Sequence, residues 1–421
     1  MESQGRIEAL TGLRFLAAFS ILFSHAFDWL FHFSDSDVSR NFSVLSVYGM
    51  PLFFVLSGFV IHYNYGSLFA RERYGSACWQ FGVARFARLY PLFVVLLLFS
   101  CAADSFFTNN ANLVVRILAR YLTLTQTWKY TVYDHRMLPN WIFGLSWSVS
   151  TEWFFYLAYA LLIFRVRALG SVKTALAATV GFVVLVFSLS VWGSDHRGLF
   201  ILPADGNLGT PDLFNNSFYR WALYFSPYAR LPEFILGCLV AQLYLALKEK
   251  PGPVEQRAGQ IAGLLSLVFL GWAGWAWVSM GPDHPHVTNY VSFMSLNFGV
   301  APGLALMIFC CARYRIFAGV VDAPIMLALG ERSYSIYLIQ PWTLNILNKA
   351  TPEHLTASSA ADALLRVILG ILATLVVADA TYRLIEVPAR RWLRKRFQRV
   401  APRTVGQATS PTPVASALRM T

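Results

Sequence analysis

Apolar stretches of about twenty residues constrain this chain more than any other feature of its sequence. A helix of that length matches the hydrocarbon thickness of a bilayer, so each stretch predicts a membrane-spanning helix. Of the 421 residues, 56% are hydrophobic and only 13% are charged, which is more apolar than soluble globular domains usually are. We therefore expect an all-α protein, a polytopic bundle of transmembrane helices.

About ten spans are predicted, near residues 11–32, 45–63, 89–104, 145–164, 172–193, 228–247, 258–280, 291–312, 323–348 and 363–385. A further segment, 113–128, contains Arg116 and Arg120 and is either an eleventh span or an interfacial helix. If it does not cross, the basic connectors all fall on one face, as the positive-inside rule requires of cytoplasmic loops. We therefore expect ten spans in a bacterial inner membrane, with both termini in the cytoplasm.

The sequence indicates one membrane domain at 7–395 and a disordered cytoplasmic tail at 396–421, which is rich in Pro, Ser and Thr and lacks apolar periodicity. The net charge of +12 comes from short basic clusters between apolar runs, a pattern typical of membrane topology rather than of nucleic-acid binding. The five cysteines form no CxxC pair and are expected to be free thiols. No metal site is expected, because His284 and His286 lie in an expected outer loop with only Asp283 beside them and no thiol nearby.

Titratable side chains within a span are energetically costly and usually face a functional cavity. In "LTGLRFLAAFSILFSHAF", Arg14 and His25 are eleven residues apart, about three helical turns, so they share one face about 16 Å apart along the axis. In "GLSWSVSTEWFFYL", Glu152 lies about 10 Å below the outer surface, close to the expected depth of His25. Ser148 shares the face of Glu152, and Tyr337 reaches a similar level from a later span.

The spacing alone leaves two interpretations open for His25 and Glu152. A lone histidine on an apolar face is more often a hydrogen-bonded core residue than a catalyst, and a tyrosine or tryptophan near a span end is usually an interfacial anchor. The cost of titratable groups within a span supports the functional interpretation, so the spacing alone does not decide between the two.

Seven short segments then narrow the interpretation. They are "LTGLRFLAAFSILFSHAF", "GMPLFFVLSGFVI", "ARFARLYPL", "LSWSVSTEWFFYL", "ARLPEFILGCLVA", "LGERSYSIYLIQPW" and "YRLIEVPARR". Together, in this order, they resemble the acyltransferase 3 family of integral membrane acyltransferases over residues 7–395. The resemblance matches the family's arginine to Arg14, its essential histidine to His25, its paired arginines to Arg85 and Arg88, and its acidic residue to Glu152.

Two departures from the family pattern accompany the resemblance. Gln340 stands where many members have a histidine, so no second imidazole is available at that level. We also expect no fused extracytoplasmic esterase-like domain of the kind that some members carry.

The resemblance implies transfer of an acyl group, usually acetyl, from cytoplasmic acyl-CoA to a hydroxyl of a carbohydrate such as an exopolysaccharide or lipopolysaccharide sugar. His25 is the expected general base and Glu152 the group that orients its imidazole. The expected substrate-binding residues are Arg14, Arg85, Arg88, Ser148 and Tyr337, with the arginines on the CoA phosphates.

Several alternatives stay open at this stage. The acceptor could instead be a macrolide or another glycosylated natural product, and the chain could be a transporter or flippase without enzymatic activity. The sequence does not decide the acyl chain length, the oligomeric state, or whether transfer is direct or passes through a covalent intermediate.

Overall fold

The structure, a computed structural model, describes residues 7–31, 38–103, 111–133, 135–142, 144–202, 211–280, 293, 296–350 and 359–397. The predicted tail, apart from its first two residues, lies outside these ranges, as do His284 and His286.

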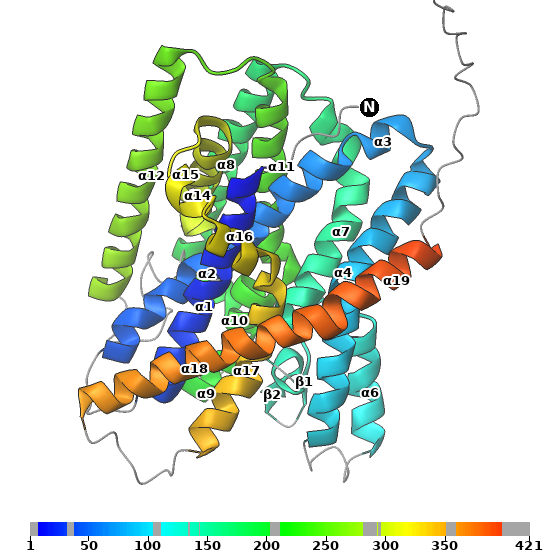
Figure 1. Ribbon diagram of the computed structural model, residues 1–421, viewed down its shortest axis with the longest axis vertical. Coiled ribbons are helices and arrows are strands. Elements are labelled where there is room, and N and C mark those ends of the chain that lie inside the picture. The colour runs from blue at the N-terminus through cyan, green and yellow to red at the C-terminus, as the bar shows by residue number, and fades with distance from the viewer. Residues whose placement is uncertain are drawn as a thin grey trace, which may run out of the picture.

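Helices make up nearly all of the described chain (Figure 1). They are α1 (Glu8–Leu30), α2 (Val38–Tyr65), α3 (Leu68–Arg71), α4 (Tyr74–Ala103), α6 (Ala111–Leu122), α7 (Ser146–Arg167), α8 (Val172–Asp195), α9 (Pro211–Asn216), α10 (Phe218–Arg220), α11 (Pro227–Ala246), α12 (Pro253–Met280), α14 (Ala301–Tyr314), α15 (Ala318–Val321), α16 (Pro324–Glu331), α17 (Ser333–Ala350), α18 (Ala360–Thr381) and α19 (Val387–Phe397). Two short strands, β1 (Val132–Tyr133) and β2 (Arg136–Met137), pair antiparallel. Two π-helical segments occur, at Trp221–Phe225 and Tyr382–Glu386.

Eight of the described helices are long and apolar enough to cross a bilayer, so the protein is a polytopic helical membrane bundle. The predicted span at 291–312 corresponds to a shorter apolar helix, Phe298–Tyr314. The predicted span at 323–348 divides into α16 and α17 around Arg332. That break follows from charge: Glu331 and Arg332 interrupt the apolar run, and the Arg332 guanidinium forms an ion pair with Asp379 of α18.

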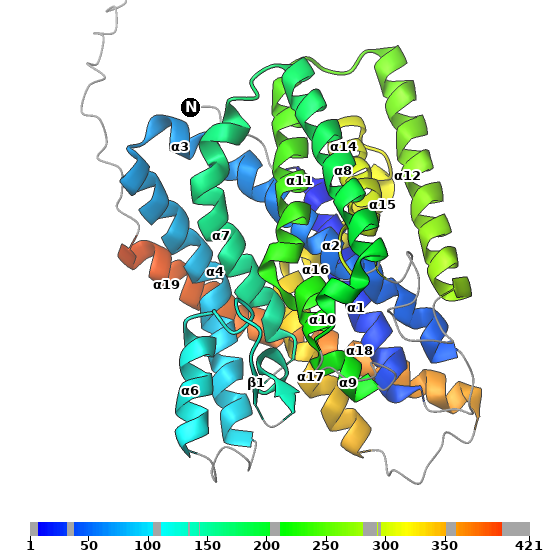
Figure 2. The same ribbon diagram turned by 180° about the vertical axis from the view of Figure 1, so that it is seen from behind.

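The doubtful segment at 113–128 forms α6, a helix of only 12 residues that is too short to cross a bilayer. Its apolar side is buried at Ile117 and Tyr121, whereas Arg116 is exposed. The helix is therefore amphipathic, and it runs alongside the end of α4 instead of forming a span of its own (Figures 1 and 2).

Connectors gather at two ends of the bundle (Figures 1 and 2). The start of α1, the α2–α4 connection with α3, and the α7–α8 and α11–α12 turns lie at one end. The connectors at this end carry basic residues, among them Arg71, Arg73, Lys248 and Lys250. This distribution is what the positive-inside rule predicts for a cytoplasmic face, and we call it the basic end.

Close helix contacts depend on glycine. At Gly58 of α2, an added Cβ would collide with the backbone of Phe234 on α11, and at Gly237 of α11 it would collide with the backbone of Val55 on α2. Without a hydrophobic driving force between helices in lipid, such close backbone approach supplies the van der Waals contacts that hold spans together. The pair therefore fixes α2 against α11.

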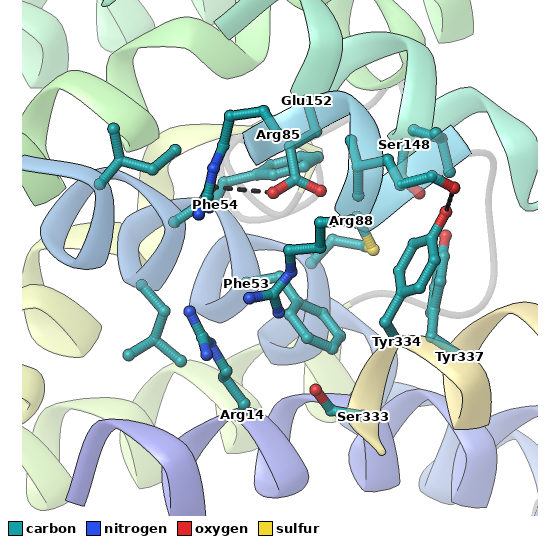
Figure 3. A pocket seen from close by; sticks show the side chains of 16 residues that line it. Arg14, Phe53, Phe54, Arg85, Arg88, Ser148, Glu152, Ser333, Tyr334 and Tyr337 are labelled. Carbon is teal, nitrogen blue, oxygen red and sulfur yellow. Dashed lines mark hydrogen bonds between the residues drawn. The ribbon is translucent and has the colours of Figure 1, made fainter. Parts of the chain in front are cut away.

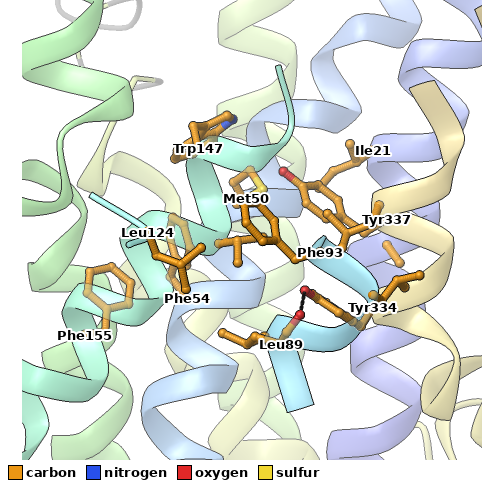
Figure 4. Close-up of a cluster of buried hydrophobic side chains, with 14 of the residues drawn as sticks. Ile21, Met50, Phe54, Leu89, Phe93, Leu124, Trp147, Phe155, Tyr334 and Tyr337 are labelled. Atoms are coloured by element: carbon orange, nitrogen blue, oxygen red, sulfur yellow. Dashed lines mark hydrogen bonds between the residues drawn. The ribbon is translucent and has the colours of Figure 1, made fainter. Parts of the chain in front are cut away.

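An aromatic core lies beside this contact, between α2, α4, α7 and α17. Trp147, Phe54 and Phe155 meet Phe93 and Tyr337 there (Figure 4). The phenol of Tyr334 is satisfied by donating to the Leu89 carbonyl oxygen at 2.6 Å. This rigid layer borders the cavity described next.

Candidate active site

A cavity inside the bundle collects polar side chains from five helices (Figure 3). Its polar lining residues are Arg14 from α1, Ser57 from α2, Arg85 and Arg88 from α4, Ser148 and Glu152 from α7, and Ser333, Tyr334 and Tyr337 from α17. Six of the seven side chains that the sequence singled out therefore share one cavity. The seventh, His25, is not among the residues that line it.

Three guanidinium groups converge on this cavity. Arg85 is only 7% exposed; it donates to the Tyr65 hydroxyl at 2.8 Å and stacks over the Tyr65 ring. Its Nε is buried without a hydrogen-bond partner in the described structure. Arg14 and Arg88 are partly buried, and across the described ranges neither forms a hydrogen bond or an ion pair. The three groups thus hold unused donor capacity inside the bundle.

Glu152 lies among these arginines. Its Oε1 accepts hydrogen bonds from the Ser57 hydroxyl at 3.1 Å and the Tyr156 hydroxyl at 2.5 Å, and its charge acts on Arg14 and Arg85. One carboxylate faces three guanidinium groups in this cavity, so an excess of positive charge remains. Such an arrangement favours an anionic ligand, and guanidinium groups suit phosphate oxygens in particular.

A second cavity adjoins the first on the way to the basic end. The two share Arg14 and Arg88, and Tyr63, Tyr382 and Arg390 line the second. Because both cavities use the same two arginines, one extended ligand can contact these groups from either side.

Glu386 supplies a second carboxylate close to these arginines. It is 2% exposed and ends the π-helical segment Tyr382–Glu386. It accepts a hydrogen bond from Ser335 at 2.9 Å and lies 3.6 Å from the Arg390 guanidinium, and the charges of Arg88 and Arg14 act on it. Glu386 and Glu152 therefore offset part of the positive charge when no ligand is bound.

Ser148 and Tyr337 mark the other end of the first cavity. Both hydroxyls donate to the Leu145 carbonyl oxygen, at 3.1 Å from Ser148 and 3.2 Å from Tyr337, and their side chains also interact with each other. The structure thus brings the two residues together, in agreement with the expectation that they lie at a similar depth in the membrane.

His25 occupies a different environment. Its ring stacks on Trp29 with centroids 5.7 Å apart, and the Gln340 side chain lies near enough to act on it electrostatically. Nδ1 of His25 and Oε1 of Gln340 are nevertheless buried without a hydrogen-bond partner in the described structure. Gln340 is fully buried and donates from Nε2 to the Tyr337 carbonyl oxygen at 3.0 Å. His25 therefore lies about one helical turn of α17 beyond Tyr337.

The structure does not bring His25 and Glu152 together as expected. The recorded contacts of Glu152 are with Ser57, Tyr156 and the arginines, whereas those of His25 are with Trp29 and Gln340. Counting residues from each helix end gives depth only for parallel helices; spans that tilt and cross lose that common level.

Sequence reasoning missed several polar residues around the site. Glu386 and Arg390 belong to "YRLIEVPARR", and the glutamate after an apolar run was the available signal. Gln340 was noted only as a missing histidine, although it reaches His25. Among the described residues, no group of three or more His, Cys, Asp or Glu side chains is arranged to hold a metal ion.

Comparison with known proteins gives a consistent result. A family of acyltransferase domains matches residues 7–383. The chain is 26% identical to the acyltransferase MdmB of Streptomyces mycarofaciens, with 93% of each chain covered. It is 23% identical to the peptidoglycan O-acetyltransferase OatA of Listeria monocytogenes and to a putative O-acetyltransferase of Staphylococcus aureus, covering 92% and 91% of this chain. It spans only 56% and 57% of those two proteins. No solved structure matches.

Proposed function

The chain belongs to the acyltransferase 3 family, and from this premise we propose that it transfers an acyl group, acetyl in the first instance, from cytoplasmic acyl-CoA to a carbohydrate hydroxyl. Membership makes it a multi-pass membrane acyltransferase, and the relatives' names indicate O-acyl transfer. We propose acyl-CoA as the donor, a carbohydrate as the acceptor and the bacterial inner membrane as the location.

The observation that carries the proposal is the convergence of Arg14, Arg85 and Arg88 on one cavity inside the bundle. Acyl-CoA combines a phosphate-rich head with a long, narrow arm. Guanidinium groups at the junction of two cavities suit such a ligand, because they bind phosphate oxygens while the arm continues into the bundle. Before the donor binds, the carboxylates of Glu152 and Glu386 partly neutralise the guanidinium charges and so lower the free energy of burying them.

Transfer itself is proposed to use His25 as general base. Its neutral imidazole takes the proton from the acceptor hydroxyl while that oxygen attacks the thioester carbonyl carbon. The carbon–sulfur bond then breaks, and the imidazolium returns the proton to the CoA thiolate, so the products are an ester and CoA. Trp29 packs against the face of the ring, and Gln340 is the polar side chain beside it.

The position of His25 sets a requirement on the donor. Because His25 lies beyond Tyr337 and outside the arginine-lined cavity, the thioester has to pass the Ser148–Tyr337 end of that cavity. The two hydroxyls there are proposed to bind the acyl-bearing arm during this passage.

Glu152 stays in the proposed catalytic set, but its contacts favour a task other than orienting the imidazole. With Oε1 engaged by Ser57 and Tyr156, the carboxylate balances the guanidinium charges and keeps their donors pointing into the cavity. It thereby supports transfer through the placement of the donor.

For the acceptor, a carbohydrate such as an exopolysaccharide or lipopolysaccharide sugar is proposed first. Support comes from the similarity to a protein named as a peptidoglycan O-acetyltransferase, because peptidoglycan contains sugar hydroxyls. Acylation of a glycosylated natural product is the second possibility.

The test is a transfer assay with purified protein in lipid nanodiscs, labelled acetyl-CoA and a panel of oligosaccharides. We expect label in the sugar and release of free CoA, both lost in His25→Ala. Protein that binds no acetyl-CoA, or that moves a glycan across vesicles without any acyl donor, would contradict the proposal and favour a transporter.

A further inference from the structure

A third hollow opens at the basic end, at the turn between α11 and α12. Tyr63, Tyr244, Lys248, Lys250 and Arg313 are among the residues that line it. Nothing in the proposed chemistry above uses this hollow, which we call the turn pocket.

Tyr63 connects the turn pocket to the rest of the site. It lines both this pocket and the cavity that contains Arg390. That cavity in turn shares Arg14 and Arg88 with the inner cavity beside Glu152. Three hollows therefore adjoin in series, from the exposed α11–α12 turn to the interior of the bundle.

Two tyrosine rings form one wall of the turn pocket. Tyr63 and Tyr244 meet edge to face, with centroids 5.9 Å apart and planes at 71°. Phe59 packs against both rings, with its centroid 6.4 Å from that of Tyr63 and 5.8 Å from that of Tyr244. Tyr63 is only 8% exposed and Tyr244 is half-buried, so Tyr244 presents the more accessible ring of the pair. Flat heterocycles such as nucleobases stack on surfaces of this kind.

The cations of the pocket fall into two groups. Arg313 is held in place, because its Nε contacts Glu255 at 3.0 Å and its NH1 donates to the Leu247 carbonyl oxygen at 2.9 Å. Lys248 and Lys250 are exposed, and within the part of the chain that the structure describes they form no ion pair.

Glu249 is the acidic residue of the pocket lining. Because Glu255 neutralises Arg313, the two lysines face this single carboxylate and one net positive charge remains. The pocket therefore offers an aromatic surface and exposed ammonium groups to a ligand with a planar base and a negative charge.

We propose that the turn pocket binds the adenosine 3′-phosphate end of acyl-CoA, with the adenine against Tyr63 and Tyr244 and the 3′-phosphate between Lys248 and Lys250. The inference rests on the proposed acyl-CoA donor. The diphosphate then lies in the middle cavity at Arg14, Arg88 and Arg390, and the pantetheine arm enters the inner cavity. In this arrangement, each chemically distinct part of the donor lies in its own hollow.

The experiment compares CoA with 3′-dephospho-CoA, which lacks only the proposed lysine ligand. Affinities are measured by calorimetry in nanodiscs of zwitterionic lipid, for the wild type, for Lys248→Ala/Lys250→Ala, and for Lys173→Ala. Lys173 is an exposed lysine at the α7–α8 turn on the same basic end, outside all three hollows, so it serves as the matched control.

We expect the wild type and the Lys173 control to bind CoA on the order of tenfold more tightly than dephospho-CoA, as phosphate contacts to charged donors allow. The double lysine variant should lose this preference while its dephospho-CoA affinity stays unchanged, which also shows that it is folded. Tyr244→Leu should weaken both ligands equally.

Two results would overturn the inference. One is a wild type that binds CoA and dephospho-CoA equally; the other is a double variant that keeps the preference. If the double variant instead changes only the response to added anionic lipid, the pocket binds lipid headgroups. If acyl-CoA is not the donor at all, the wild type binds neither CoA nor dephospho-CoA, which distinguishes that case from failure of the turn-pocket inference.

Discussion

The inner and outer halves of the site differ in how ready they are for a ligand. The inner half is an arginine-lined cavity with more guanidinium groups than carboxylates, and it connects to a second cavity toward the basic end. The outer half holds His25 between Trp29 and Gln340, outside that cavity. Binding groups are thus pre-arranged, whereas the proposed base is enclosed by packing. Donor binding and acyl transfer should therefore separate under mutation.

The largest separation is expected from His25→Ala. Loss of a general base typically lowers the rate by about 10²–10⁴-fold, while the affinity for acetyl-CoA should stay unchanged because the arginine cavity is untouched. Turnover and calorimetric binding measured on the same preparation check both statements. His196→Ala provides the histidine control, since His196 is exposed at the end of α8. If the donor affinity of His25→Ala falls as much as its rate, His25 contributes to donor binding and the two halves do not act separately.

Arg88→Ala should produce the opposite pattern. Removing one charge-assisted contact to phosphate costs about 1.5–3 kcal/mol, roughly a 10- to 100-fold weaker donor affinity. The rate at saturating donor should fall much less. Equilibrium binding of CoA at two salt concentrations checks this, with exposed Arg116→Ala on α6 as the control. An unchanged CoA affinity in Arg88→Ala would show that no CoA phosphate is bound at Arg88.

Glu152→Gln tests whether the carboxylate belongs to the inner or the outer half. The amide oxygen can still accept from Ser57 and Tyr156, so mainly the charge is lost. If Glu152 balances the arginines, CoA should bind about two- to fivefold more tightly, and the pH profile of the rate should not move. A shifted pH profile with unchanged CoA affinity would instead place Glu152 in contact with the imidazole during turnover.

The smallest effect is expected at Gln340. Gln340→Leu removes the neutral polar side chain beside His25. A hydrogen bond formed with it during turnover would be worth about 0.5–1.5 kcal/mol, so the rate should fall roughly two- to twelvefold and its pH profile should shift. Gln340→Glu, which keeps the shape and adds charge, should shift that profile in the direction of a stronger base. Equal losses in both variants without a change in the profile would indicate a packing role only.

Much of the architecture followed from composition and spacing. Apolar runs predicted a polytopic helical bundle, and charge counting predicted that 113–128 does not cross, because bilayer thickness and the cost of buried charge act locally along the chain. The break between α16 and α17 was not predicted. Glu331 and Arg332 interrupt the apolar run locally, but Asp379 of α18, with which Arg332 forms an ion pair, lies far along the chain.

Residue types and resemblance identified Arg14, Arg85, Arg88, Ser148 and Glu152 as site residues to be tested, and the structure gathers them in one cavity with Tyr337. What the sequence by itself determined is which side chains are too costly to bury in lipid without a partner or a use. Only the tertiary structure decided which of them meet: it joined Glu152 to the arginines and His25 to Gln340. The physical reason is that residue counts fix position along a helix, whereas tilt, crossing and close contacts such as Gly58 against Phe234 fix which helix faces share a cavity.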